Sequence, residues 1–156
     1  MKNETYTIRK ITSADETDFM EMSREFYASD AVLHEIDPAF HRAAFEELMR
    51  SDAYLEAVIF TVGNVPAGYA LLNKTFSREA GGITVWLEEL YLRPAYQGKG
   101  IGSGFFRWME AHFPAARYRL EVEPDNRRAA ALYRRMGYSE LPYLQMVKDR
   151  GEEKTK

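Results

Sequence analysis

Two adjacent carboxylates, Glu88 and Glu89, lie near the end of an apolar stretch, Ile83 to Arg93, that is typical of a β-strand. A carboxylate in such a place can take a proton from an amine or hold a cationic group. Successive side chains of a strand point to opposite faces unless a bulge intervenes, so we expect only one of the two to face a reaction site directly. The alternative interpretation is a solvated surface pair, the usual position of Glu.

A glycine-rich loop follows this strand, with the sequence Gln97-Gly98-Lys99-Gly100-Ile101-Gly102. Glycine permits left-handed backbone conformations and the close approach of a ligand. The next stretch, 100–113, has the apolar spacing of a helix, whose N-terminus offers free N–H groups and a positive dipole end to an anion. The loop therefore predicts a site for a phosphate-bearing ligand, and a plain strand-to-helix connector is the alternative.

Two common phosphate-binding motifs do not fit this loop. A P-loop needs Lys-Ser/Thr after its final glycine, but Gly104 is followed by Phe105. The dinucleotide pattern G-x-G-x-x-G fails as well, because its sixth position is Ser103 when counted from Gly98 and Phe105 when counted from Gly100. The sequence thus excludes both motifs as the source of the phosphate site.

Composition narrows the class of protein. The chain has 156 residues, of which 46% are hydrophobic, enough for one domain with a full core. A net charge of -3 argues against a dedicated nucleic-acid binder. There is no cysteine, and His34, His41 and His112 have no ligand spacing, so no metal site is expected. The chain shows neither a secretory signal nor a membrane span, which predicts a cytoplasmic protein with no membrane partner.

The elements that must position these residues follow from periodicity and end signals. A Ser13/Glu16 capping box and Asp37-Pro38 predict the starts of two helices, and Gly137 predicts the end of a helix that follows Asn126. Strands are predicted near 6–8 and over 54–62, 67–76, 83–93, 118–123 and 141–147. The order β-α-α-β-β-β-α-β-α-β predicts an α/β (α+β) fold with a mixed sheet covered by helices. Residues 1–148 are expected to form one domain and 149–156 a charged tail.

These residues resemble the GCN5-related N-acetyltransferases. The family signature, Gln/Arg-x-x-Gly-x-Gly/Ala after a strand, is matched fully by residues 97–102, and the lead-in Leu-Tyr-Leu-Arg-Pro at 90–94 looks like that of the family. Glu123-Pro124-Asp125-Asn126 with the following Tyr133, Gly137 and Tyr138 looks like a second family region. The resemblance covers nearly the whole chain. It implies a mixed, mostly antiparallel sheet of six to seven strands with helices on both faces.

The resemblance also implies acetyl-CoA as co-substrate. The loop beginning at Gln97 would hold its pyrophosphate on the backbone amides of Gly98, Lys99, Gly100, Ile101, Gly102 and Ser103. The pantetheine arm would lie along the backbone of Leu90, Tyr91 and Leu92. Asn126 would bind the pantetheine region, and Tyr133 would protonate the departing thiolate. The alternative role for Tyr133 is that of a packed aromatic on an apolar helix stripe.

The run Leu-Glu-Glu-Leu-Tyr at 87–91 resembles the Leu-Glu-Asp-Ile-Tyr run of diamine (polyamine) N-acetyltransferases. It implies Glu88 as the base and Glu89 as a cation-binding neighbour. We expect a small-molecule primary amine as acceptor, with Phe26 and Tyr27 against its alkyl part. Because no Ser or Cys nucleophile pattern is present, direct attack on the thioester is the simpler mechanism.

Other functions remain open at this point. The alternatives are a protein or peptide N-acetyltransferase and a non-catalytic acyl-CoA sensor. An exposed last strand would allow pairing in a homodimer, a frequent habit of the family.

Overall fold

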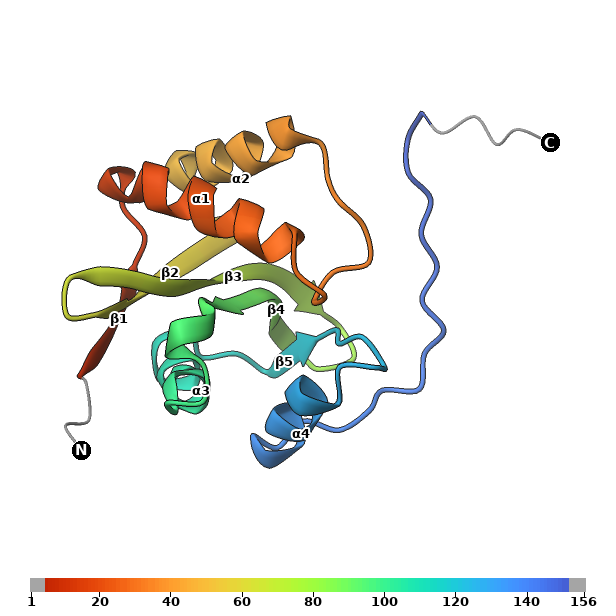
Figure 1. Cartoon of the computed structure of the whole chain (residues 1–156). Coiled ribbons are helices and arrows are strands. Elements are labelled where there is room, and N and C mark those ends of the chain that lie inside the picture. The colour runs from red at the N-terminus through yellow and green to blue at the C-terminus, as the bar shows by residue number, and fades with distance from the viewer. Residues whose placement is uncertain (1–4, 152–156) are drawn as a thin grey trace.

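The computed structural model describes residues 5–151 (Figure 1). Five strands form one sheet in chain order: β1 Tyr6–Lys10, β2 Leu55–Val62, β3 Val65–Ser77, β4 Gly82–Leu92 and β5 Arg117–Leu120. The pairs β1–β2, β2–β3 and β3–β4 are antiparallel, and the pair β4–β5 is parallel. The predicted mixed, mostly antiparallel sheet is confirmed, with five strands in the described part of the chain rather than six to seven.

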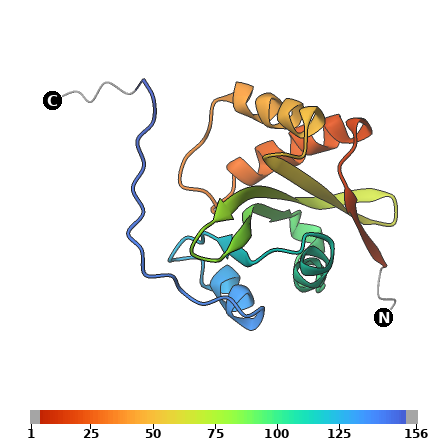
Figure 2. The same ribbon diagram turned by 180° about the vertical axis from the view of Figure 1, so that it is seen from behind.

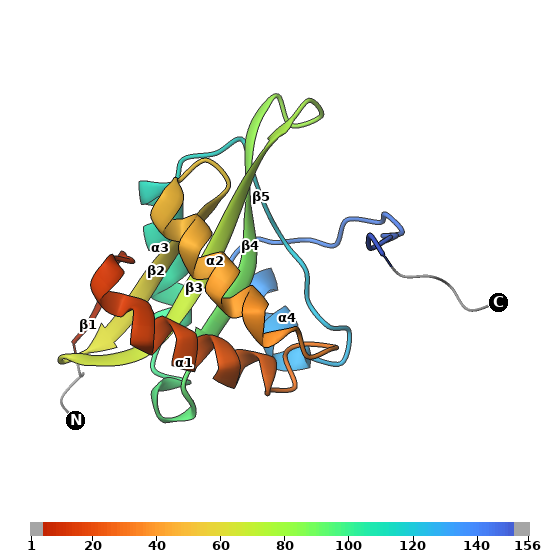
Figure 3. The ribbon, with the colours of Figure 1, turned by 90° about the horizontal axis from the view of Figure 1, so that it is seen from above.

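Helices cover both faces of the sheet, as predicted. One face carries α1 (Glu16–Tyr27) and α2 (Pro38–Arg50), and the other carries α3 (Ile101–His112) and α4 (Arg127–Arg135) (Figures 1 and 2). Each face has its own hydrophobic cluster. Seen from above, β3 and β4 extend beyond the helices as a long hairpin (Figure 3). Within residues 5–151, none of the helices has the length and apolar character that a bilayer span requires.

The cap of the helical segment that leads into α1 differs from prediction by one residue. A single 3-10 turn, Ser13–Asp15, comes before the α-helix, so Thr12 takes the position of the cap. The Asp15 carboxylate accepts a hydrogen bond from the Thr12 backbone N–H at 2.8 Å. The capping pair is therefore Thr12 and Asp15, where the sequence pattern had indicated Ser13 and Glu16.

Two other end signals are confirmed. The Asp37 side chain accepts the N–H of Ala39 at 2.9 Å, and Pro38 occupies the first turn of α2. Gly63 takes a positive φ of 61° in the turn between β2 and β3. At both positions the residue type determines the local backbone conformation.

The predicted last strand, 141–147, is wrong: this segment is not part of the sheet. The chain leaves α4 through Gly137, whose φ is 93°, and the Tyr138 N–H returns to the Tyr133 carbonyl at 3.0 Å. Beyond this turn the chain runs away from the body of the protein (Figures 1 and 2). An apolar pattern indicates a strand, but the pattern does not say which strand it pairs with.

A bulge interrupts the pairing of β4 with β3. Leu71 lies opposite Glu89 and Leu72 lies opposite Leu87. Glu88 is therefore an extra residue that has no partner on β3. A bulge of this kind shifts the side-chain alternation of the strand by one residue. The bulge lies where the sequence places its two carboxylates.

Candidate active site

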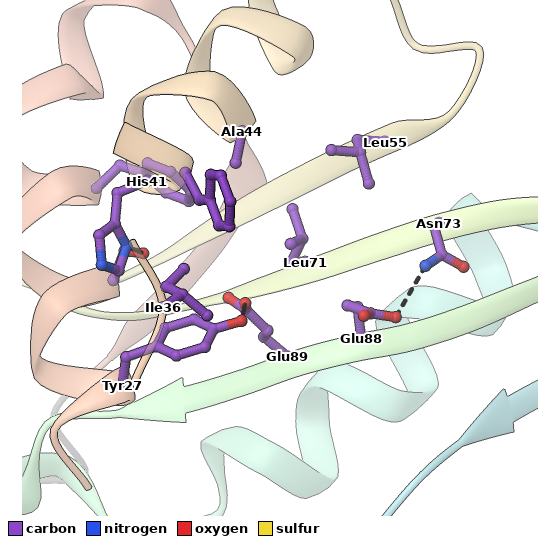
Figure 4. A pocket seen from close by; sticks show the side chains of 12 residues that line it. Tyr27, Ile36, His41, Ala44, Leu55, Leu71, Asn73, Glu88 and Glu89 are labelled. Atoms are coloured by element: carbon purple, nitrogen blue, oxygen red, sulfur yellow. Dashed lines mark hydrogen bonds between the residues drawn. The ribbon is translucent and has the colours of Figure 1, made fainter. Parts of the chain in front are cut away.

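A cavity of about 310 Å³ opens between α1, α2 and the sheet (Figure 4). Its wall is mostly apolar, and two carboxylates lie at one side. The lining residues are Phe19, Ser23, Tyr27, Ile36, Phe40, His41, Ala44, Leu55, Leu71, Asn73, Glu88 and Glu89. An apolar cavity with a few convergent polar groups is the usual form of a small-molecule site.

The bulge explains why both carboxylates line this one cavity. Before it, Val85 and Leu87 point into the cluster beneath α3; after it, Leu90 and Leu92 do so. The alternation has changed from odd to even positions, so the residues at the junction share the opposite face. The expectation that only one carboxylate would face the site is therefore wrong. The sequence contains a signal for this change, because the apolar residues of the strand occupy odd positions at Val85 and Leu87 and even positions at Leu90 and Leu92.

Glu89 is the buried member of the pair, with 8% of its surface exposed. Its two oxygens accept hydrogen bonds from the hydroxyls of Tyr27 at 2.8 Å and Tyr69 at 2.6 Å. Burial raises the pKa of Glu89, and the two tyrosine hydrogen bonds oppose that rise. Because both oxygens are engaged, Glu89 is held in place as a fixed acceptor at the side of the cavity.

Glu88 is exposed and held by a single contact. Its Oε2 accepts a hydrogen bond from Asn73 Nδ2 at 2.8 Å, which orients the carboxylate. An entering molecule can therefore reach Glu88 more easily than Glu89. Of the two, Glu88 has the accessibility that proton exchange with an acceptor needs.

His41 and Ser23 form a buried pair in the same cavity. His41 Nδ1 and Ser23 Oγ are 2.6 Å apart, and the His41 ring packs edge-on against Tyr27. Burial, with a contribution from Arg24, lowers the pKa of His41 and so favours its neutral form. The sequence did not identify this histidine as a site residue. Its position four residues before the buried Phe45 was the available signal, since that spacing puts both on the inner side of α2.

The two aromatics proposed for the acceptor lie in different surroundings. Tyr27 lines the cavity and donates to Glu89. Phe26 lies in the core, 7% exposed, with its ring against those of Tyr27, Tyr69 and Tyr91. The observed contribution of Phe26 is to support the tyrosine beside it.

The glycine loop has the geometry of an anion site. Gly98 and Gly100 have φ values of 72° and 83°, a region that other residues avoid. The Gln97 side chain donates to the Leu92 carbonyl at 2.9 Å and so ties the loop back to the end of β4. Helix α3 begins at Ile101, and the N–H groups of a first helical turn have no partner within the helix. These features fit a pyrophosphate.

Beside the loop, the edge of β4 toward β5 has no neighbouring strand within the described residues. Its pairing with β5 runs from Thr84 to Leu87, while its pairing with β3 continues to Leu92. Over the rest of β4, within the described residues, the edge toward β5 is therefore not part of a ladder. This stretch contains Leu90, Tyr91 and Leu92, the residues assigned to pantetheine, and its backbone suits an extended ligand.

Asn126 and Tyr133, the two other residues that the sequence analysis predicted on the cofactor side, lie at helix α4. Asn126 caps it, its side chain accepting the Ala129 N–H at 3.2 Å. The Tyr133 ring packs against Phe106 and Tyr138, at centroid distances of 5.7 and 6.2 Å, and burial raises its pKa. Tyr133 is outside the lining of the cavity. The structure thus unites Glu88, Glu89 and Tyr27 in one cavity, and places Tyr133 in the cluster on the α3 side.

Known proteins are similar to this chain in sequence or in fold. Mouse thialysine N-epsilon-acetyltransferase is 27% identical over 150 residues, covering 86% of this chain and 84% of the mouse protein. The structure of AAC(6')-Iy with the bisubstrate analogue CoA-S-monomethyl-acetylneamine superposes with a TM-score of 0.77 at 16% identity, covering 94% of this chain and 99% of that one. A possible acetyltransferase from Clostridium difficile 630 gives a TM-score of 0.75 at 19% identity, covering 94% and 98%. At such identities the structural likeness establishes the fold.

The sequence itself establishes the family. Residues 17–138 match the profile of the Acetyltransferase (GNAT) family, a span that includes the cavity, the bulge, the glycine loop and α4. This protein therefore belongs to the GNAT family of acetyltransferases and is an N-acetyltransferase.

Proposed function

We propose that the protein transfers the acetyl group of acetyl-CoA to a primary amine of a small molecule, by direct attack of the amine on the thioester. The observation that carries this proposal is the pair of carboxylates that the β4 bulge directs into one cavity. The family membership of the chain supports the acetyl transfer, and the cavity supports the choice of acceptor.

The cofactor side offers a consistent set of contacts for acetyl-CoA. The amides of Gly98 to Ser103 and the N-terminus of α3 would hold the pyrophosphate. The edge of β4 at Leu90 to Leu92 would hold the pantetheine arm, and the Asn126 amide group would be a further contact. Acetyl-CoA supplies the activated acetyl group when it binds.

The proton inventory can be balanced with residues of this chain. An alkylamine has a pKa near 10.4 and is mostly protonated at neutral pH. Glu88 takes a proton from the ammonium group, directly or through water, and the amine nitrogen then bonds to the thioester carbonyl carbon. The carbon–sulfur bond breaks, and the leaving thiolate takes a proton from the Tyr133 hydroxyl. The second ammonium proton, which the new amide nitrogen still carries, returns to the Tyr133 oxygen through water, and Glu88 releases the first proton to solvent. Because burial raises the pKa of Tyr133, that hydroxyl keeps its proton until needed.

The lining of the cavity favours a cationic acceptor with an alkyl chain. Glu88 and Glu89 would attract the ammonium group, and Leu55 and Leu71 give an apolar wall beside them. Among the described residues that line the cavity, none is Lys or Arg. An acceptor that carries its own carboxylate would thus find no cation there. We infer that alkyl diamines suit the cavity better than free amino acids do.

Steady-state acetylation of an amine panel tests this proposal. The panel contains an alkyl diamine, a monoamine of equal length, an amino sugar, free lysine and a peptide with a free N-terminus. We expect the highest kcat/KM for the diamine and a much lower value for lysine. Activity on the peptide alone would instead support a protein acetyltransferase. Tight CoA binding without transfer to any amine would support a sensor.

A further inference from the structure

A chain of four buried polar side chains runs from α2 across α1 to the sheet. His41 Nδ1 lies 2.6 Å from Ser23 Oγ, and the Tyr69 hydroxyl lies 2.6 Å from Glu89 Oε2. A hydrogen bond between Ser23 and Tyr69 links the two halves. All four residues are buried. The chain therefore joins His41, at one end of the cavity lining, to the buried carboxylate on β4.

The number of protons gives this chain a direction. As a carboxylate, Glu89 only accepts, so the Tyr69 hydroxyl donates its one proton to it. The Tyr69 oxygen must then accept from Ser23, and Ser23 Oγ, whose own proton is now used, must accept from His41. The pKa of Tyr69 agrees: burial and the Glu89 charge raise it, and the hydrogen bond from Ser23 opposes that rise. His41 Nδ1 therefore carries a hydrogen.

This direction decides what His41 offers to the cavity. Burial, with a contribution from Arg24, lowers the pKa of His41 and favours the neutral ring, which has one N–H. With that hydrogen on Nδ1, Nε2 keeps its lone pair. Within residues 5–151 no group donates to Nε2 at hydrogen-bond distance, and the atom is not sealed from solvent. Since His41 is 6% exposed and lines the cavity, the cavity is the place from which a donor can reach it.

The polar groups of the cavity wall are mainly acceptors. The Tyr27 proton is used on Glu89, and Asn73 gives one of its amide protons to Glu88. What remains is dominated by lone pairs of the two carboxylates and of His41. Figure 4 shows His41 and Glu88 at opposite sides of the view, with Glu89 between them. A ligand that carries hydrogen-bond donors at both ends would satisfy both sides, and an acceptor left without a donor is costly.

We propose that His41 Nε2 accepts a hydrogen bond from the second amine of the acceptor, while Glu88 faces the amine that reacts. This inference rests on the proposed function, and it names the residue that distinguishes a diamine from a monoamine. His41 binds the far end of the substrate and takes no proton in the transfer. A monoamine of equal length has no donor there and leaves Nε2 without a partner.

Two variants of His41 separate its two nitrogens. Asn places its amide near the position of Nδ1 and has no atom at Nε2, whereas Gln reaches the Nε2 position with its amide. His41→Asn should lower kcat/KM for the diamine by about 10- to 100-fold, the range of a hydrogen bond to a charged group, and leave the monoamine unchanged. His41→Gln should keep more of the diamine preference. The control His112→Asn, on the exposed side of α3, should keep all of it. A full diamine preference in His41→Asn would overturn the proposal.

Nitrogen NMR tests the same assignment in the unaltered protein, without acetyl-CoA. At mildly alkaline pH, above the usual pKa of histidine, ring ¹⁵N shifts distinguish the two neutral tautomers. His112 is a reference, because its Nδ1 lies 2.8 Å from the Trp108 carbonyl oxygen, which only accepts. His41 should match His112, with its proton on Nδ1. The diamine should shift the Nε2 signal of His41, and the monoamine should not. A proton on Nε2 would contradict the proposal.

These measurements also separate this inference from the proposed function. A diamine that shifts the Nε2 signal of His41, but is not acetylated, would support the inference and contradict the proposed reaction. Acetylation of the diamine with an unmoved Nε2 signal would support the reaction and overturn the part assigned to His41.

Discussion

The two faces of the sheet differ in the groups that they offer to a ligand. On the α1–α2 face, α1 buries five residues, and the cavity carboxylates are held by Tyr27, Tyr69 and Asn73. On the α3–α4 face, none of the described residues of α4 is buried, and β4 leaves part of one edge free. The proposed acceptor side therefore presents side chains that are already held in place, whereas the proposed cofactor side presents backbone groups that a ligand can bind.

This difference separates the kinetic effects expected from the two faces. Changes in the cavity should alter the acceptor parameters and the chemical step, and leave acetyl-CoA binding intact. Changes in the loop should alter acetyl-CoA binding first. Variants that break this division would show that the two faces are coupled.

The largest effect is expected for Glu88→Gln. Loss of the base should lower kcat/KM for the amine by about 10²–10⁴-fold. The loss should be greatest at low pH, where more of the amine is protonated. Calorimetric titration should show unchanged CoA affinity. Glu46→Gln, an exposed carboxylate on α2, is the control and should be fully active. Wild-type activity in the Glu88 variant would remove this residue from the mechanism.

On the other face, Tyr133→Phe should lower kcat by about tenfold, a modest loss for an acid because a thiolate leaves readily. The KM for acetyl-CoA should be unchanged. Since burial raises the pKa of Tyr133, wild-type activity should not fall between pH 7 and 9 through loss of this proton. Tyr138→Phe is the matched control, because its ring also packs on Phe106. Equal activity of the two variants would leave Tyr133 a packing residue.

A glycine comparison tests the loop. Gly100→Ala forces a side chain into a φ of 83°, at a strain of about 1–2 kcal/mol. It should lower stability and raise the KM for acetyl-CoA several-fold. Gly63→Ala brings similar strain at a φ of 61°, and in both places an added Cβ meets nothing within 4 Å. The Gly63 variant should therefore lose stability without a change in KM. If both shift KM equally, the loop has no special part in cofactor binding.

The smallest effect concerns the pH dependence of stability. Burial raises the pKa of Glu89 in the folded state, so its contribution to stability is present below the unfolded pKa and is lost as the pH rises through the folded value. Glu89→Gln removes this loss. Urea unfolding from pH 4 to 8 should show the variant gaining on the wild type as the pH rises. A constant difference between the two proteins would mean that Glu89 titrates alike in both states.

Much of this architecture could be predicted because local residue types decide it. Asp37-Pro38, Gly63 and Gly137 each mark a backbone position that few other residues suit, and each was found where predicted. The cavity could not be derived in the same way. Ser23 and His41 meet from two helices, and periodicity within one element says nothing about such a meeting.

The segment 141–147 shows another limit of prediction from sequence. The stretch 141–147 has the composition of a strand buried on both faces, but pairing depends on an edge elsewhere in the sheet, which composition does not identify. The bulge in β4 could have been predicted, because the spacing of apolar residues changes from odd to even positions along this one strand.

The bulge at Glu88 also limits how this gene can change. Deleting that single codon would let β3 and β4 pair without interruption, and one half of β4 would have to turn over. Either Val85 and Leu87 would leave the core, or Leu90 and Leu92 would. Deletion of residue 88 should therefore prevent correct folding, whereas substitution of Glu88 should reduce catalytic activity and leave the fold intact. For the fold, the side chain at position 88 can change, but the residue itself cannot be removed.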